Sequence, residues 1–488
     1  MSEAMAQMPP ALYGPTEKER KYDRQLRLWA ASGQSALESA NILLVNTGCG
    51  TVGVEALKNL VLPGIGSFTI ADESSDNSTF EQLLQTSELF SLILVTMPID
   101  ASRFQLLESY ASKHNVPLVV VHSSGFYSYF RLVLPSAFPI VDTHPDETAT
   151  ADLRLLSPWP ELTKFAKDMA KDIDSLDDHE HGHLPLVVIL LHYLEWWKDS
   201  HDGAYPVAYH DKTAFRDIVS KSMRRDNPEG GEENFEEAVA AVMKHVVEPL
   251  VPSTLKQLFD YQDQDTESTK SSFWIITGAV KKFYEAHGVL PLPGSLPDMK
   301  AQSHVYIQLQ NIYKNKARQD ASEVLSTVRN TPGGADVDPQ EVELFCTNAR
   351  FIKLINSPND KARTLAQITE QELGNDEIAS ISGPEMPLSL VPIYLALSAT
   401  AHADEAPTAE AIMVSITQRV PEAANKERIV KAAQEVSRTF GNELHNVSAA
   451  IGGMVAQEMI KIITKQYIPI DNTCIYDGIV SRCQVLRL

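Results

Sequence analysis

The sequence predicts a doubly wound α/β fold of the Rossmann type, split in the chain by a large, mainly helical insertion. Three observations predict this fold class. Apolar runs alternate with helical patterns between residues 41 and 134, which is typical of parallel strands joined by helices. A glycine-rich turn follows the first apolar run. The same alternating texture returns only near the end of the chain, after a long helical stretch.

The first predicted element is an amphipathic helix over residues 17–30. Tyr22, Leu26 and Trp29 recur at helical spacing on one face, and charged residues occupy the rest. Residues 1–16 have no pattern and contain proline, so we expect them to be frayed.

The elements that follow alternate between strand and helix. Residues 41–46 form an apolar run typical of a buried parallel strand. A helix over residues 51–62, with Leu57, Leu60 and Val61 facing inward, ends at Pro63 and Gly64. Further predicted elements are a strand at 67–72, a short helix near 80–84, a strand at 92–96, a helix at 102–113, and strands at 118–121 and 127–134.

From about residue 146 to residue 439 the pattern is mostly helical, which predicts an insertion of one or two subdomains. The α/β texture then resumes with a helix over 448–465 and two strands joined around Asp477 and Gly478, a common hairpin turn. The predicted domains are 1–148, the first part of the α/β domain; 149–440, the helical insertion; and 441–488, its C-terminal part.

The glycine turn has the spacing of a nucleotide-binding fingerprint. Gly48, Gly50 and Gly53 follow a strand and open a helix, and Asp72 ends the next strand 19 residues beyond Gly53. Such glycines let the backbone approach a phosphate, the helix N-terminus offers N–H donors, and the carboxylate could bind ribose hydroxyls. The alternative is a tight strand–helix turn that needs small residues for packing.

The residues that follow weaken the nucleotide interpretation. No lysine or arginine lies between Asp72 and Arg103, whereas a triphosphate needs several cations or a metal held by carboxylates. The turn after strand 92–96 reads Met97-Pro98, and Asp100 lies beyond the position of a magnesium ligand. Together with the family resemblance described below, this predicts that the loop residues Gly48, Gly50, Gly53 and Asp72 are vestigial.

Composition limits the class of protein. The net charge of −22 and the isoelectric point near 5.1 argue against a protein that binds the phosphate backbone of nucleic acids. Four cysteines without a CxxC pair fit a reducing compartment. The N-terminus lacks the pattern of a secretory signal, and the apolar run 184–194 is too short to span a bilayer. We expect a cytoplasmic or nuclear protein that binds neither nucleic acid nor membrane.

Several motifs together resemble the adenylation fold of ubiquitin-like-modifier-activating enzymes. Within that family the chain resembles the regulatory subunits of heterodimeric neddylation-activating enzymes, of the amyloid-precursor-protein-binding type. The fold class is thereby an adenylation-type, Rossmann-like domain. The motifs that carry the resemblance are 21–29, 34–37, 57–66 with Asp72, 144–146, 152–155, 215–217 and 449–466.

The resemblance implies a split active centre. The family pairs two adenylation-type folds, of which only one holds a competent ATP site and the catalytic cysteine. The other lends an arginine from its N-terminal helix, and Arg24 matches that arginine. A guanidinium suits the role because it is always charged and binds phosphate oxygens in a fixed fork. The alternative is a surface helix in which Arg24 pairs with an Asp or Glu.

The cofactors and partners are likewise implied by the resemblance. The chain would hold no cofactor of its own, and ATP with magnesium would bind in the partner subunit. Its partners would be the cysteine-bearing catalytic subunit and a ubiquitin-like modifier, with the conjugating enzyme as a further candidate. The segment after Asp72 is short by a few tens of residues compared with the family, through either a deletion or a gene-model error.

Other candidate groups favour structural interpretations. His179, His181 and His183 alternate as metal ligands on a strand would, but no fourth ligand is near in sequence, so we predict a solvated loop and no metal site. A thioester-forming cysteine needs a thiolate near a helix N-terminus or a cation. Cys49 lies inside the glycine loop, where an attached modifier tail would have no room. Cys346 is on an apolar helix face, and Cys474 and Cys483 lie in the terminal hairpin, so we expect none of the four to form a thioester.

Two alternative functions remain open. The regulatory subunit for the SUMO-type modifier shares the Tyr-Asp-Arg-Gln pattern of residues 22–25, but its helical insert is much smaller. A free-standing NAD-dependent oxidoreductase would use the glycine loop and Asp72, and would bind NAD as the isolated chain. It would leave residues 21–29 and the helical insert unexplained.

Overall fold

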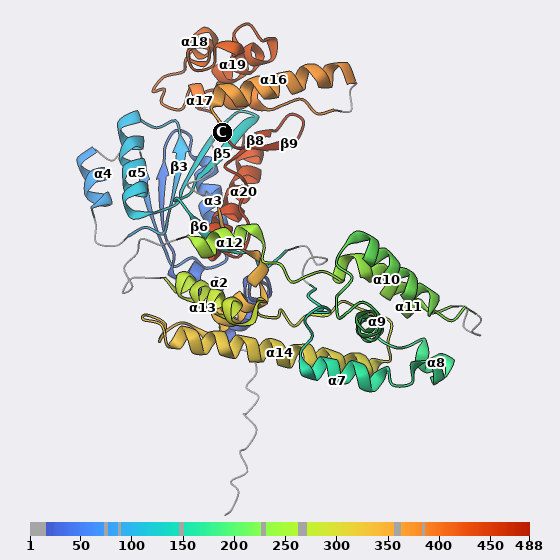
Figure 1. Ribbon diagram of the computed structural model, residues 1–488. Coiled ribbons are helices and arrows are strands. Elements are labelled where there is room, and N and C mark those ends of the chain that lie inside the picture. Colours follow the sequence, from blue (N-terminus) through green and yellow to red (C-terminus); the bar gives the residue numbers. More distant parts are fainter. Residues whose placement is uncertain are drawn as a thin grey trace, which may run out of the picture. The chain divides into compact units, whose positions relative to one another are not determined.

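The computed structural model in Figure 1 divides the chain into two compact units, Met1–Phe138 with Ile355–Leu488, and Pro139–Leu354. The domain ranges predicted from the sequence, 1–148, 149–440 and 441–488, are not tested by this division into two units and stay a prediction. The structure describes residues 16–72, 77–85, 89–145, 151–225, 231–261, 271–355, 363–382 and 386–488. Of residues 1–16, which we expected to be frayed, 1–15 lie outside the described residues, and Thr16 instead caps the first helix with its side chain.

A mixed sheet forms the centre of the first unit and confirms the predicted α/β class. Within the described residues it has seven strands in the order β2-β1-β3-β4-β5-β8-β9. The first four are parallel, and β5, β8 and β9 join antiparallel. The strands are β1 (Asn41–Asn46), β2 (Ser67–Asp72), β3 (Leu92–Met97), β4 (Leu118–Ser124), β5 (Tyr127–Val133), β8 (Thr473–Asp477) and β9 (Arg482–Leu486).

Helices cover both faces of the sheet, as a doubly wound fold requires. Odd residues of β1 and β3, such as Leu43 and Ile93, pack with α4 (Asn77–Leu84) and α5 (Ala101–His114). The opposite face carries α3 (Thr51–Val61), which packs on β1, β3 and β4, and α20 (His445–Thr464), which packs on β4 and β5. Helices α3 and α20 also cross each other closely, because a Cβ on Gly452 would lie 2.6 Å from the Cβ of Glu55.

In the described part of the first unit, four further α-helices and one short 3₁₀-helix follow the insertion in sequence. The apolar helix α17 is almost entirely buried against β5, and α18 and α19 pack with it in a common core. This group lies beyond β5 and β8 in Figure 1, coloured orange. Its elements are α16 (Leu365–Ser382), α17 (Val391–Ala399), α18 (Ala409–Arg419), η3 (Pro421–Ala423) and α19 (Glu427–Thr439).

The second unit is mainly helical around two apolar cores. One core gathers α7, α9, α10 and α11 with the first half of α14, and the other gathers α12, α13 and α15 with its second half. A two-stranded sheet of β6 (Phe138–Val141) and β7 (Ile352–Ile355), not predicted from the sequence, lies at its ends. The helices are α7 (Pro160–Met169), η1 (Ile173–Ser175), α8 (Asp178–His181), α9 (Leu186–Ser200), α10 (Tyr209–Lys221), α11 (Glu233–His245), α12 (Ser253–Asp260), α13 (Ser272–His287), α14 (Ser303–Arg329), α15 (Pro339–Thr347) and η2 (Ala349–Phe351).

Three local predictions were wrong in detail. The N-terminal helix is two helices, α1 (Glu17–Lys21) and α2 (Asp23–Ser39), separated at Tyr22, and α2 itself is interrupted at Ala30, which has φ 55° and ψ −174°. Val61 is exposed, because it lies in the last turn of α3, where the helix leaves the sheet. The terminal hairpin has no two-residue turn at Asp477, because Asp477 pairs directly with Arg482.

One helix in the described part of the chain, α20, is long and apolar enough to pass a test for a membrane span. More than half of its apolar window is buried inside the first unit, as expected of a core helix.

Candidate functional site

Helix α2, which carries Arg24, is fixed at both ends of its first segment. Tyr22 is buried, and its hydroxyl lies so close to Gly64 that a Cβ there would be 2.5 Å away. Trp29 is also buried and donates from its indole nitrogen to Gln34 at 3.2 Å. Gln34 in turn donates to the carbonyl of Pro63 at 3.0 Å. Two aromatic anchors therefore hold the helix against the end of α3.

Residues that follow α20 also contact α2. The Tyr467 hydroxyl donates to the carbonyl of Leu28 at 3.1 Å, directly before the non-helical residues Trp29 and Ala30. The Gln466 side chain donates to the Ser32 hydroxyl at 3.2 Å. The kink is thus accommodated by the C-terminal part of the domain.

Arg24 projects from this fixed helix into solvent. Its side chain is exposed, and it makes no hydrogen bond or ion pair with any described residue. Arg27, one turn later, differs from Arg24 because its guanidinium pairs with the Asp23 carboxylate at 3.1 Å. Pairing of Arg24 with a neighbouring carboxylate, the alternative considered from the sequence, is not observed in the described part of the chain. The fork of its guanidinium is available to an external anion.

The glycine loop is shaped by packing beneath it. Gly48 and Gly50 have positive φ, 61° and 65°, and Gly50 is the N-cap of α3. A Cβ on Gly50 would lie 2.3 Å from the Asn46 side chain, and one on Gly53 would lie 2.6 Å from the same side chain and 2.7 Å from Thr96. Close packing therefore requires glycine here, whether or not a nucleotide binds.

Asp72 lies at the same edge of the sheet as the glycine loop. It ends β2 directly beside Asn46 in the parallel register, and its side chain is exposed. The structure thus brings together the glycines and the carboxylate that the sequence singled out. Nucleotide binding by these residues stays a prediction. Asp100, the other carboxylate considered, caps α5 by accepting N–H bonds from Ser102 and Arg103 at 3.0 and 3.1 Å.

The sequence analysis missed a carboxylate that contacts the loop. Glu443 accepts a hydrogen bond from the backbone N–H of Val52, in the first turn of α3, at 2.8 Å. The Ser448 hydroxyl donates to the same oxygen at 2.6 Å. Burial raises the pKa of the Glu443 carboxyl above its usual value, and hydrogen bonds from Ser448 and from the backbone at the start of α3 offset only part of that rise.

Three of the four described thiols lie in environments that disfavour the reactive thiolate. Burial raises the pKa of Cys346 and of Cys474 to about 12, and it also raises that of Cys483. Such thiols stay protonated at neutral pH and are poor nucleophiles. Cys49 is exposed, with its sulfur 3.4 Å from the Thr51 hydroxyl. The raised pKa values support the interpretation of Cys346, Cys474 and Cys483 as structural residues.

The alternating histidines make local contacts instead of converging. His181 is buried and bonded to Glu232 at 2.6 Å, so the prediction of a solvated loop is wrong for this residue. His183 contacts the carbonyl of His179 at 2.7 Å on the short helix α8 and the turn after it. The described residues contain no group of three or more His, Cys, Asp or Glu side chains able to hold a metal.

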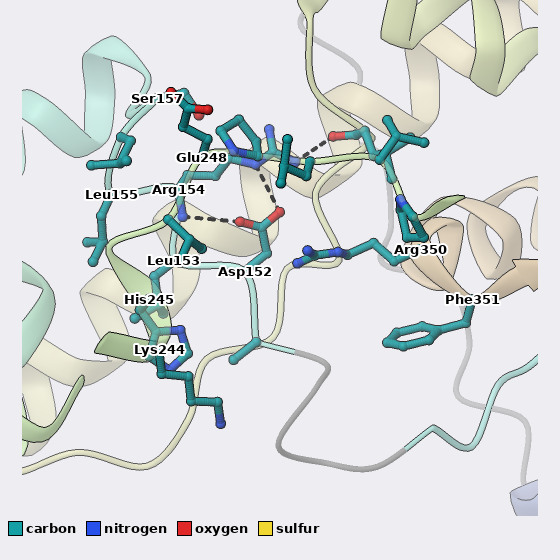
Figure 2. Close-up of a pocket in the computed structure, with 18 residues that line it drawn as sticks. Asp152, Leu153, Arg154, Leu155, Ser157, Lys244, His245, Glu248, Arg350 and Phe351 are labelled. Carbon is teal, nitrogen blue, oxygen red and sulfur yellow. Dashed lines mark hydrogen bonds and ion pairs between the residues drawn. The ribbon is translucent and has the colours of Figure 1, made fainter. Parts of the chain in front are cut away.

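The motif at residues 152–155 lines a cavity of about 390 Å³ in the second unit. Arg154 is buried there, bonds the Asp152 carboxylate at 3.0 Å and donates to the carbonyl of Leu290. Figure 2 shows this pair on one side of the cavity and Arg350 on the other. The Arg154 guanidinium is thus bonded within the protein and stabilises the cavity wall, in contrast to Arg24.

Comparisons with known proteins agree on one family. The pattern of the ThiF family matches residues 22–76. The NEDD8-activating enzyme E1 regulatory subunit of Xenopus laevis is 32% identical over an alignment 549 residues long, gaps included. The alignment covers 96% of this chain and 99% of that protein. The Arabidopsis thaliana protein named NEDD8-activating enzyme E1 regulatory subunit AXR1 is 30% identical and covers 97% of each chain.

Among solved structures, E. coli MccB with succinimide matches with a TM-score of 0.22 and 13% identity, over 27% of this chain and 52% of that one. At this score the match adds nothing to the assignment. The alignment with the Xenopus protein is longer than the 488 residues of this chain, so this chain lacks residues that the relative has. The shortened segment after Asp72 stays a prediction.

Proposed function

This chain belongs to the family of NEDD8-activating enzyme E1 regulatory subunits, and from that premise we propose that it is the half of a heterodimeric activating enzyme without the reacting thiol. In the proposed reaction the C-terminal carboxylate of a ubiquitin-like modifier attacks the α-phosphate of ATP and releases pyrophosphate. A cysteine thiolate of the catalytic subunit then attacks the acyl-adenylate, forms a thioester and releases AMP. ATP and magnesium bind in the catalytic subunit.

In this proposal the chain contributes Arg24 to the partner's ATP site. A guanidinium supplied from a second subunit would bind phosphate oxygens as negative charge shifts onto the leaving pyrophosphate. Because α2 is anchored, Arg24 would already be positioned before the subunits bind, so little conformational freedom of the helix would be lost. The observation that carries the proposal is that Arg24 has no partner among the described residues although its helix is anchored by buried aromatic side chains.

The remaining parts of the proposal concern partners and place. The chain would bind the catalytic subunit, contribute to the surface that receives the modifier, and offer a candidate surface to the conjugating enzyme. It would act in the cytoplasm, the nucleus or both, since its thiols are unpaired and its composition is acidic. The raised pKa values of Cys346, Cys474 and Cys483 support placing the thioester on the partner.

Exchange of pyrophosphate into ATP by the reconstituted heterodimer tests the role of Arg24. We expect Arg24→Ala to slow modifier-dependent exchange by about 10²-fold, the usual effect of losing one charged donor to a transition state. Heterodimer formation, measured by gel filtration, should be unchanged because the side chain is exposed.

Arg27→Ala is the matched control. Arg27 is one turn away on the same helix, equally exposed, and already paired with Asp23, so its loss should leave exchange within about twofold of wild type. Equal exchange by wild type and Arg24→Ala, or equal loss in both variants, would remove the proposed role of Arg24.

A further inference from the structure

The carboxylate of Glu443 lies at the start of α3, directly after the glycine loop, where it accepts a hydrogen bond from the Val52 N–H. In dinucleotide-binding folds the first N–H groups of the helix after the loop bind a pyrophosphate, helped by the positive end of the helix dipole. Here the corresponding donors are the backbone N–H groups of Gly50, Thr51 and Val52 at the start of α3. Of these three, the Val52 N–H donates to a Glu443 oxygen at 2.8 Å, and the other two lower the pKa of the Glu443 carboxyl.

The backbone around Glu443 is fixed by the fold, so this contact does not depend on one mobile side chain. The N–H of Gly125, just after β4, donates to the carbonyl of Asn442 at 2.9 Å, and Gly125 forms a bridge with Glu443 itself. The Thr439 hydroxyl is 2.9 Å from that of Ser124. The chain between α19 and α20 therefore crosses the carboxyl end of β4 and delivers Glu443 to the loop.

A second helix also begins beside this carboxylate. Ser448, in the first turn of α20, donates its hydroxyl to the same Glu443 oxygen at 2.6 Å. The N-termini of α3 and α20 thus share one negative group, and both are regions where negative charge is favourable. The Asn46 side chain packs directly beneath Gly50 and Gly53, so the loop is supported from below.

We propose that Glu443 is a built-in substitute for phosphate: its carboxylate satisfies the amides of the glycine loop and excludes nucleotide from this chain. The loop then serves as a joint between α3 and α20 and closes the split domain after the long insertion. This inference does not depend on the role of Arg24, because it concerns the chain's own loop.

Anion rescue of the full-length chain tests the proposal. Thermal unfolding is followed for wild type and Glu443→Ala in sodium phosphate and in sodium chloride of equal ionic strength. We expect Glu443→Ala to lower the unfolding midpoint by about 2 °C in chloride, as loss of a helix cap does. Phosphate should restore part of that loss, because a ligand that binds only the folded chain stabilises it. The wild-type midpoint should be the same in both salts.

Glu458→Ala is the control for nonspecific effects of phosphate. Glu458 is buried, accepts the N–H of Ile470 at 2.9 Å and pairs with Lys461, but it faces no helix N-terminus. Its loss should lower the midpoint equally in both salts. Phosphate that raises the Glu458→Ala or wild-type midpoint as much as that of Glu443→Ala would overturn the proposal, as would a Glu443→Ala midpoint indifferent to phosphate.

Glu443→Gln keeps the proposal testable should the alanine variant fail to fold. The amide retains an oxygen acceptor and the shape of the side chain but not its charge, so we expect a folded chain without phosphate response. Calorimetry on the isolated wild-type chain then decides: no heat of ATP binding is expected. ATP binding by the folded wild-type chain would show an open loop and refute the proposal.

Discussion

Arg24 and Glu443 are opposite charges on the same compact unit, and the fold treats them differently. Arg24 stands on a helix anchored by Tyr22 and Trp29, yet its guanidinium has no partner among the described residues. Glu443 is delivered from the far end of the sequence and accepts hydrogen bonds from the start of α3 and from Ser448.

This difference indicates which of the two regions, the N-terminal helix with Arg24 or the glycine loop with Glu443, is available to bind another molecule. Polar groups that are satisfied inside a protein contribute to stability, whereas a rigidly placed but unpaired charge is free to bind something outside. The glycine loop, which carries the more familiar sequence fingerprint, is the satisfied region. The N-terminal helix is the unsatisfied one, and substitutions in the two should therefore affect different measurements.

The largest effect is expected from a side chain at Gly50. Alanine there would adopt an unfavourable positive φ of 65°, and its Cβ would push the Asn46 side chain from beneath the loop. We expect Gly50→Ala to lower the free energy of unfolding by about 3 kcal/mol, measured by urea denaturation.

Gly453→Ala is the matched control for this substitution. Gly453 lies within α20, and a Cβ there would have no heavy atom within 4 Å. Alanine should stabilise the chain by about 0.5–1 kcal/mol, because it favours the helix. Similar destabilisation by both variants would contradict the assignment of the loop as a packed joint.

The next effect concerns acid stability at the same edge of the sheet. His122, near the carboxyl end of β4, is buried, and burial lowers its pKa to about 3. The folded chain therefore keeps His122 neutral at pH values where the unfolded chain protonates it. The stability that the neutral imidazole contributes is fully present above pH 6.5 and is lost as the pH falls from 6.5 toward about 3. Wild type should lose about 2 kcal/mol more than His122→Gln between pH 6.5 and 5. Parallel pH profiles of the two would contradict this.

A smaller effect is expected from a conservative change at Arg24. Lysine keeps the positive charge but loses the two-pronged geometry of the guanidinium. We expect Arg24→Lys to slow pyrophosphate exchange by the heterodimer about tenfold, between wild type and Arg24→Ala. Its free energy of unfolding should stay within about 0.5 kcal/mol of wild type, because the side chain is exposed. An equal loss in the lysine and alanine variants would show that bidentate geometry, and not charge, carries the whole role.

The smallest effect is expected at the cysteines. Because Cys346 and Cys474 have pKa values near 12 and are buried, they should react with iodoacetamide only when the chain unfolds. The exposed Cys49 should react in the folded chain. Cys49→Ser should leave thioester formation by the heterodimer unchanged, since the reacting thiol is assigned to the partner. A lost thioester would reverse that assignment.

Much of the fold follows from local sequence patterns. The apolar runs at 41–46, 92–96 and 118–121 predicted buried strands. The observed β1 has the predicted bounds, and β3 and β4 continue only as far as Met97 and Ser124. The glycine loop was predicted as a strand–helix turn because its spacing has a direct geometric meaning. Arg24 was found through a resemblance, since its exposure and missing partner leave no mark in one sequence.

The features that escaped prediction depend on distant contacts. Glu443 lies 391 residues beyond Val52, and an acidic residue just before a helix is ordinarily interpreted as serving that helix. The kink at Ala30 lies beside the carbonyl of Leu28, which accepts a hydrogen bond from Tyr467 near the other end of the chain. The strands β6 and β7 are short and separated by the whole insertion, so no local pattern joins them.

Thioester formation by separated subunits tests the central claim most directly. This chain and a cysteine-bearing catalytic subunit of the family are purified apart, then assayed alone and together with ATP, magnesium and the modifier. The account predicts a modifier thioester only in the mixture, on the catalytic subunit. A thioester formed by this chain alone, or full activity of the catalytic subunit without it, would contradict a split active centre.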